Sequence, residues 1–227
     1  TLFIDNSQIS LLEAQMAQTG YLTGAQMAGA FQMLRSYDLL WSRMVNEYLL
    51  GDRAPMNDLM AWNADATRMP AKMHSQYLRR LFLNDDLSEG HYPVRGKPVS
   101  LGGITLPTFM VGTVTDHVAP WRSVFKLHLM SPAEITFALT SGGHNDGIVN
   151  PPGNERRRYQ LLTRPAGGSY VAPEEWLETA PRTQGSWWPA WLEWLKARSG
   201  TPAKPPRMGA GAYKPVGDAP GTYVLEK

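Results

Sequence analysis

Two short polar segments hold the residues whose types suit acid–base chemistry. The segment 112–121 contains Asp116 and His117, and the segment 140–147 contains Ser141 and His144. A histidine base needs a carboxylate on its second ring nitrogen, because the carboxylate fixes the tautomer and stabilises the imidazolium. We therefore expect Asp116 and His144 to act as a catalytic acid and base whose side chains lie within hydrogen-bond reach.

Each polar segment follows an apolar stretch of strand length. The stretches are 108–114 and 134–140, and the residues from Pro120 to about Leu129 between them have a helical pattern. Strand, helix and strand at this spacing predict a parallel sheet, whose carboxyl edge is where ligand sites of α/β folds lie. Gly142 and Gly143 would let the backbone bend to present His144. Such apolar strands need further neighbours, so the chain either packs against another copy or lacks its first half.

Other interpretations of these residues stay open at this point. Asp116 alone is typical of a turn or a helix N-cap, and a lone His144 in a glycine-rich loop is often structural. A metal site built from Asp116, His117, His144 and Asp146 competes, because oxygen and imidazole ligands suit several divalent metals. Adjacent residues such as Asp116 and His117 rarely face one ion together, so we expect no metal. We expect no cofactor either.

The sequence contains no recognisable nucleophile. There is no cysteine, and neither G-x-S-x-G nor G-x-C-x-G occurs. Ser141 lies beside His144 in the same loop, which is the wrong place for a serine on a nucleophile elbow. The residues alone therefore give half of a catalytic apparatus.

Composition excludes several classes of protein. The 227 residues are 43% hydrophobic and 19% charged, which is typical of a globular protein. A net charge of +2 without long charge runs argues against nucleic acid as a partner. The absence of cysteine excludes a disulfide framework, and no apolar stretch reaches the roughly 18 residues of a membrane span.

The remaining pattern predicts three regions. Residues 1–60 are expected to be helical, with Ser10 and Glu13 spaced as a capping box, Gly20 as a stop, and a second helix over 37–50 that Asp38 caps. Residues 61–200 would form the α/β core, and 201–227 an extended tail rich in proline and glycine. Within 61–200 we expect helices over 70–83, from 173 and over 186–198, and a short strand or hairpin within 94–104.

Five motifs in one order resemble the C-terminal part of class I polyhydroxyalkanoate synthases, and the similarity covers essentially the whole chain. The motifs are Trp62–Pro70, Thr115–Trp121, Ser141–His144 with Asn150–Pro152, Gly185–Trp191, and Ala219–Val224. The resemblance implies an α/β-hydrolase core with a helical lid, here 1–60. It also implies a Cys–Asp–His triad that polymerises (R)-3-hydroxyacyl-CoA into polyester and releases CoA.

By this resemblance Asp116 is the triad acid and His144 the base, and the nucleophilic cysteine lies upstream of Thr1. The expected partners are the 3-hydroxyacyl-CoA substrate, the polyester chain, the upstream half of the same enzyme and a second copy in a homodimer. The expected location is the cytoplasm, at the surface of polyester granules. This chain alone should be inactive. His117 is near the site by sequence, and we assign it no step.

Two features leave room for another interpretation. The family usually has Ile-Ala-Gly after its histidine, whereas His144 is followed here by Asn145-Asp146-Gly147. The tryptophans of 187–194 would pack on the core, or would contact polymer or a granule. The alternative function is a non-catalytic granule-associated or dimerisation module on the same scaffold, and the intact Asp116 and His144 argue against it.

Overall fold

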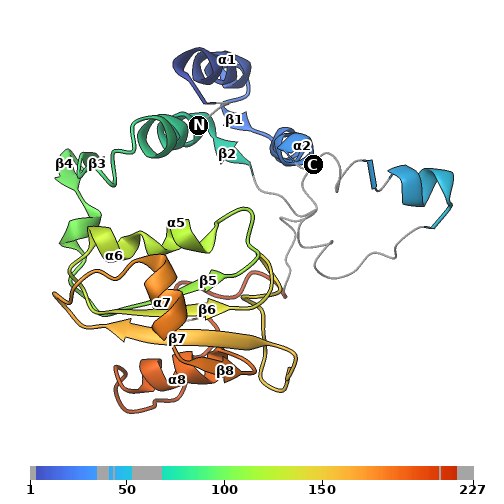
Figure 1. The fold of residues 1–227 in the computed structure, drawn as a ribbon. Coiled ribbons are helices and arrows are strands. Elements are labelled where there is room, and N and C mark those ends of the chain that lie inside the picture. Colours follow the sequence, from blue (N-terminus) through green and yellow to red (C-terminus); the bar gives the residue numbers. More distant parts are fainter. Residues whose placement is uncertain (1–3, 35–40, 43, 53–67, 210, 219–227) are drawn as a thin grey trace. The chain divides into compact units, whose positions relative to one another are not determined.

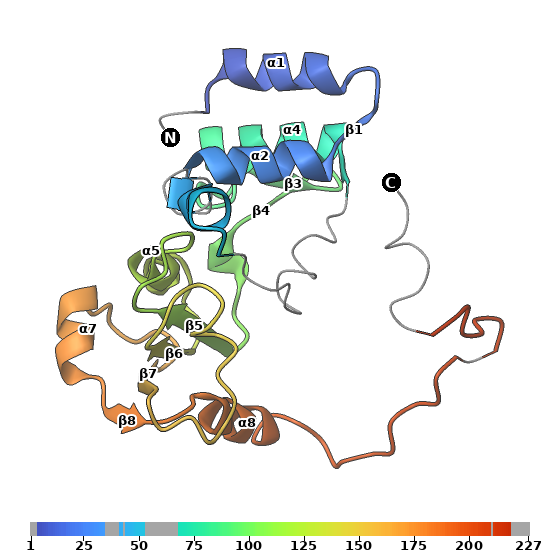
Figure 2. The ribbon, with the colours of Figure 1, turned by 90° about the vertical axis from the view of Figure 1, so that its right-hand side faces the viewer.

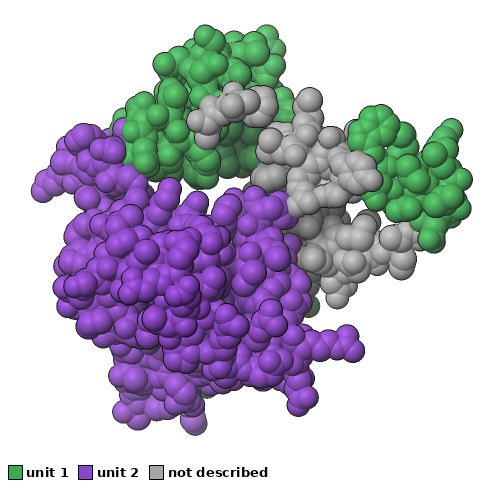
Figure 3. All heavy atoms as spheres, in the orientation of Figure 1, with its two compact units in different colours: residues 1–85, 205–227 green, residues 86–204 purple. Residues whose placement is uncertain are grey.

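The computed structural model of the protein describes residues 4–34, 41–42, 44–52, 68–209 and 211–218. The chain divides into two compact units, Thr1–Asp85 with Pro205–Lys227, and Asp86–Lys204 (Figure 3). The predicted division into a lid (1–60), a core (61–200) and a tail (201–227) refers to function rather than to compactness, and it stays a prediction. Within the described ranges, none of the helices has both the length and the apolar character needed to cross a membrane.

The first unit is built mainly from helices. Its elements are α1 (Asn6–Met16), β1 (Tyr21–Leu22), α2 (Gly24–Leu34), the π-helical η2 (Met44–Leu49), β2 (Met69–Pro70), α4 (Ala71–Tyr77) and the π-helical η3 (Leu78–Leu83) (Figure 2). Arg79 of η3 ties this unit together, because it donates to Glu13 at 3.0 Å and to Asn6 at 2.8 Å. The helix expected over 70–83 is confirmed as α4 followed by η3.

The expected capping box at Ser10 is wrong. Helix α1 begins earlier, because Asp5 Oδ1 accepts the Gln8 amide at 2.8 Å and Asp5 is therefore the N-cap. Ser10 lies inside the helix, where its spacing from Glu13 has no capping role. The predicted cap Asp38 and the motif residues 62–67 and 219–224 lie outside the described residues.

A four-stranded sheet forms the centre of the second unit. The strands are β5 (Thr108–Thr113), β6 (Ile135–Thr140), β7 (Arg158–Arg164) and β8 (Arg182–Gln184), in that order across the sheet (Figure 1). The predicted parallel pair is confirmed: β5 and β6 run parallel, joined through α5 (Trp121–Phe125) and α6 (Leu127–Met130). Strands β7 and β8 were not predicted and add antiparallel, so the protein is α/β with a mixed sheet.

Where a short strand or hairpin was expected within 94–104, the structure has a hairpin that begins two residues earlier. Strands β3 (Tyr92–Val94) and β4 (Lys97–Val99) pair around Arg95 and Gly96, whose φ angles are 50° and 79°. Two consecutive positive φ angles are typical of the two-residue turn that matches the twist of a hairpin. The short helix η4 (Leu101–Gly103) then leads into β5.

Helices cover both faces of the sheet. Helices α5 and α7 (Pro173–Thr179) pack on one face, and α8 (Trp188–Lys196) packs on the other (Figure 1). The core of the first face consists of Trp121, Phe125, Ile135, Phe137, Leu139, Trp176 and Ala180. On the other face, Phe109 contacts Trp187 and Trp194 with ring centroids 6.2 and 5.6 Å apart, which supports the packing interpretation of these two tryptophans.

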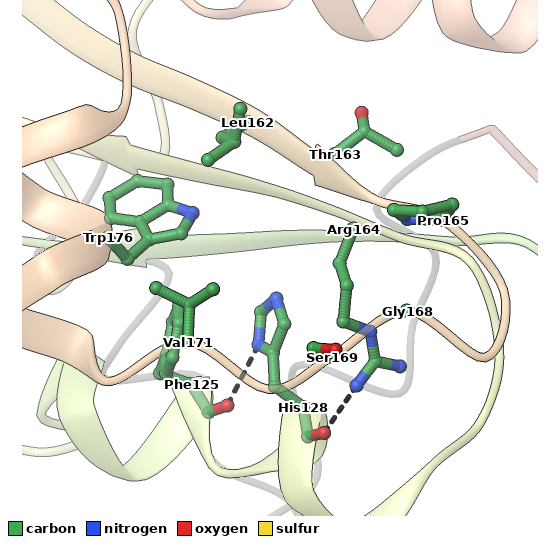
Figure 4. A pocket seen from close by; sticks show the side chains of 10 residues that line it. All are labelled: Phe125, His128, Leu162, Thr163, Arg164, Pro165, Gly168, Ser169, Val171 and Trp176. Atoms are coloured by element: carbon green, nitrogen blue, oxygen red, sulfur yellow. Dashed lines mark hydrogen bonds between the residues drawn. The ribbon is translucent and has the colours of Figure 1, made fainter.

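A cavity of about 200 Å³ lies at the end of the sheet where β6 begins (Figure 4). Its apolar walls include Phe125, Leu162 and Trp176. Its two basic side chains form hydrogen bonds with backbone carbonyls. The buried His128 donates from Nδ1 to the Phe125 carbonyl at 2.9 Å, and Arg164 donates to three carbonyls. The polar groups of this cavity therefore hold the connection between α6 and β6 in place.

Replacing Arg164 with methionine should lower the free energy of unfolding by about 2–3 kcal/mol. The guanidinium donates to the carbonyls of His128, of Ser131 at 2.6 Å and of Ala133 at 2.8 Å, and losing such donors leaves buried carbonyls unpaired. Urea unfolding measures the change. Arg182→Met on the exposed edge strand β8 is the control and should stay within about 0.5 kcal/mol of the unsubstituted protein.

The pH dependence of stability should contain a contribution from His128. Burial holds its pKa below the ordinary value of 6.5, the Arg164 charge adds to this effect, and the Phe125 carbonyl opposes it. Below pH 6.5, His128 takes up a proton in the unfolded chain but stays neutral in the folded protein. The free energy of unfolding therefore falls as the pH drops toward the lowered pKa. His128→Asn should give a shallower loss of melting temperature between neutral and mildly acidic pH. An unchanged slope would contradict this assignment.

Candidate active site

The segments that hold Asp116 and His144 begin at the same level of the sheet. Thr113 and Thr140, the last residues of β5 and β6, are register partners in the parallel pair. The Val114 amide then donates to the Thr140 carbonyl at 3.0 Å, which keeps the two segments together beyond the strands. The strand register therefore brings the two predicted residues to one edge.

The side chains of Asp116 and His144 form a hydrogen bond. His144 Nδ1 lies 2.9 Å from Asp116 Oδ2, as expected from the two strand ends. A carboxylate oxygen accepts, so Nδ1 carries the proton and Nε2 is the nitrogen left to take one. The Asp116 side chain is 7% exposed and the His144 side chain 45%, so the base reaches solvent while the acid does not. The proposed catalytic roles stay a prediction.

The second oxygen of Asp116 is held by a turn. Asp116 Oδ1 accepts the amides of Val118 and Ala119, each at 2.8 Å. The turn interpretation and the acid interpretation of this residue are therefore compatible, because each uses a different oxygen. The turn fixes the plane of the carboxylate and aims Oδ2 at the imidazole.

Asp116 is anionic at neutral pH. Burial by itself would raise its pKa, but the Ala119 amide, the His144 side chain and the Val118 amide together hold the pKa below the ordinary value of 3.8. Donors aimed at the charged form stabilise it against desolvation. The carboxylate can therefore stay charged beside an imidazolium during proton transfer.

The loop that carries His144 folds tightly enough to require glycine at two positions. Gly142 has φ +110°, and a Cβ atom there would lie 2.5 Å from Arg157 Nη1. A Cβ atom on Gly147 would lie 2.6 Å from Thr113 Cγ2 and 2.9 Å from the Gly143 carbonyl oxygen. The loop therefore packs against the end of β5, close to Asp116.

Gly147→Ala should destabilise the protein by about 2 kcal/mol or more, because the added methyl group would overlap the Thr113 side chain and the Gly143 carbonyl oxygen. Urea unfolding of the variant checks this value. The control is Gly200→Ala, where a Cβ atom meets nothing within 4 Å. Equal stability of the two variants would show that the loop is less tightly packed than described.

The other polar residues of these segments have different surroundings. Ser141 Oγ accepts the Arg158 amide at 3.1 Å, so this serine belongs to the end of the sheet. Asp146 pairs with Arg157 at 2.6 Å, and His117 is exposed. In the described part of the chain, no three side chains of His, Asp or Glu come together as a metal site would require. The metal alternative for Asp116, His117, His144 and Asp146 therefore has no support from the geometry.

Thr115 is a contact that sequence reasoning missed. Its amide and its hydroxyl both donate to the Gly142 carbonyl, at 3.1 and 2.8 Å. They join the residue before Asp116 to the loop that carries His144. A threonine between a strand and an aspartate has no distinctive pattern, so only the spatial arrangement could identify it.

Curated relatives match the whole chain. A poly(3-hydroxyalkanoate) polymerase subunit PhaC from Rhizobium etli is 40% identical over 227 residues, and the chain covers 35% of it. Poly(3-hydroxyalkanoate) polymerase 2 from Ectopseudomonas oleovorans is 42% identical, with 40% covered, and the PhaC subunit from Cupriavidus necator is 34% identical, with 39% covered. No family model matches the chain. The chain spans less than half the length of these relatives.

Proposed function

The chain belongs to the poly(3-hydroxyalkanoate) polymerase family, as a C-terminal piece of such a protein, and we propose that Asp116 and His144 are its catalytic acid and base. The reaction proposed for the complete enzyme is the polymerisation of (R)-3-hydroxyacyl-CoA into polyester with release of CoA. The observation that carries the proposal is the hydrogen bond between His144 Nδ1 and Asp116 Oδ2, which leaves Nε2 free to accept a proton.

The proposed step is the transfer of an acyl group to a thiol. His144 Nε2 takes the proton of the thiol, and the thiolate attacks the thioester carbonyl. A new thioester bond forms to the enzyme, the bond to CoA breaks, and the proton on His144 passes to the departing CoA sulfur. Asp116 holds the ring in the required tautomer and stabilises the imidazolium between these transfers.

The thiol has to come from outside this sequence. The chain contains no cysteine, and Ser141, the serine nearest to His144 in sequence, has its oxygen at the end of the sheet. We place the nucleophilic cysteine in the upstream part of the enzyme. In the sheet described here, β5 pairs with β6 on one side only, so a strand of the upstream part has an edge to join.

The proposed fold of the complete enzyme is an α/β-hydrolase with a helical lid. The parallel β5 and β6, each followed by a catalytic residue, support the hydrolase assignment. Helices α1 and α2 support a helical character for part of the lid, which we assign to residues 1–60. A lid would admit the acyl-CoA and then keep water from the acyl-enzyme.

The proposed partners and location follow from the same assignment. They are the 3-hydroxyacyl-CoA, the growing polyester, the upstream half of the enzyme and a second copy in a homodimer, at the surface of polyester granules in the cytoplasm. The hydrogen bond between Asp116 and His144 argues against a non-catalytic module on this scaffold, which would not need a histidine base held by a carboxylate.

In the complete enzyme, His144→Ala should remove nearly all CoA release from 3-hydroxybutyryl-CoA, because no base remains to form the thiolate. Asp116→Asn should lower kcat by roughly a thousand-fold or more while the protein stays folded, since the acid of a related triad contributes about ten-thousand-fold. A thiol-reactive dye measures the CoA.

The matched control is His91→Ala, an exposed histidine in the same unit, which should keep normal activity. Undiminished CoA release by the His144→Ala variant would refute the proposed function.

A further inference from the structure

The loop Ser141–Gly147 is held from two sides. On one side, Thr115 donates its amide and its hydroxyl to the Gly142 carbonyl. On the other side, Asp146 and Arg157 form an ion pair with Asp146 Oδ2 and Arg157 Nη2 2.6 Å apart. Thr115 precedes Asp116, so the first connection follows directly from the catalytic pair. The second connection has no role in the chemistry proposed so far.

Asp146 uses both of its oxygens. Oδ1 accepts the Gly143 amide at 2.6 Å, and Oδ2 accepts from Arg157. These contacts, the Arg157 donor first and then the Gly143 amide, hold the Asp146 pKa below the ordinary value of 3.8 against the opposing effect of burial. The Asp146 carboxylate therefore connects Gly143, the residue before His144, to Arg157, the residue before β7.

Arg157 is itself fixed by the sheet. Its carbonyl accepts the Gly185 amide at 2.6 Å, and the next residue, Arg158, pairs with Ser141 through both of its backbone groups. The guanidinium of Arg157 also lies against Gly142, since a Cβ atom on that glycine would come within 2.5 Å of Nη1. The Arg157 side chain is 24% exposed, so most of it is packed against the protein and its guanidinium can restrain the loop.

We propose that Asp146 and Arg157 are positioning residues, which hold the loop so that His144 keeps its contact with Asp116 during the reaction. This inference rests on the proposed function. The Asp146 side chain is 59% exposed, and an ion pair in such surroundings adds little to global stability. Its effect should therefore appear in the alignment of the base, where small displacements are costly to the rate.

The test uses the complete enzyme with Asp146→Ala, Asp146→Asn, Arg157→Gln and the Asp146→Ala/Arg157→Gln double variant. Asp146→Ala should lower kcat for CoA release about tenfold, which corresponds to about 1.4 kcal/mol at the transition state. KM should stay within about twofold and the melting temperature within about 2 °C. Asp146→Asn, whose amide oxygen still accepts from Gly143, should retain more activity than Asp146→Ala. The kcat of the double variant should lie within about twofold of the kcat of Asp146→Ala, because the two residues act through one contact.

The control is Glu174→Ala, which removes another exposed carboxylate paired with an arginine, Arg122, at 3.1 Å. It should leave kcat and KM unchanged. A second measurement does not depend on activity: hydrogen exchange of the peptide that contains 141–147 should be faster in Asp146→Ala than in the unsubstituted enzyme, and unchanged in Glu174→Ala.

The outcomes separate the two proposals. An active enzyme whose Asp146→Ala variant keeps its full kcat would overturn the positioning role, as would a loss of kcat matched by a large fall in melting temperature. An unsubstituted enzyme that releases no CoA would refute the proposed function instead. In that case, hydrogen exchange of the peptide 141–147 still tests the restraint. Unchanged exchange in Asp146→Ala would refute a restraint by the Asp146–Arg157 contact, and faster exchange would support it.

Discussion

The two oxygens of Asp116 accept hydrogen bonds from different donors, and the site depends on this arrangement. One oxygen accepts two backbone amides of its own turn, and the other accepts His144 Nδ1 at 2.9 Å. The two amides of the turn favour the charged carboxylate and fix its direction without help from the imidazole, so Oδ2 is aimed at His144 in advance. A carboxylate held only by the imidazole would be free to rotate, and the tautomer of His144 would then be less well defined.

The imidazole of His144 is held by a loop rather than by a regular turn. Register between β5 and β6 brings the two loops level, but the loop after β6 has to turn back at once to place His144 over Asp116. Close packing at Gly142 and Gly147 makes that turn possible, and Thr115, Asp146 and Arg157 hold it. A strand pair thus positions Asp116, and a network of polar contacts around two glycines positions His144.

Patterns that depend on local sequence could be predicted. Continuous apolar runs gave β5 and β6, and polar residues at their ends gave Asp116 and His144. Strand β7 was missed because Arg158–Arg164 begins and ends with arginine and has mixed exposure along its length. Strand β8 was missed because its three residues are exposed and polar, so only pairing with β7 makes them a strand.

The contacts that hold the His144 loop could not be found from the sequence for a related reason. Arg157 lies 11 residues after Asp146 across a loop that contains Pro151 and Pro152, so no helix or strand pattern connects the two residues. The predicted start of α1 was wrong for a different reason: Ser10 and Glu13 have the spacing of a capping box, but the helix begins at Asn6 and Asp5 is its N-cap. In both cases the deciding contact exists only once the chain has folded.

The most direct test of the account is the reactivity of the thiol that His144 is proposed to activate. In the complete enzyme, iodoacetamide at neutral pH should alkylate one cysteine upstream of this chain faster than an ordinary protein thiol, because a neighbouring histidine base favours the thiolate. Peptide mass mapping would identify that cysteine, and His144→Ala should slow its alkylation at least about tenfold. An alkylation rate that is the same with and without His144 would contradict the assignment of this residue as the base.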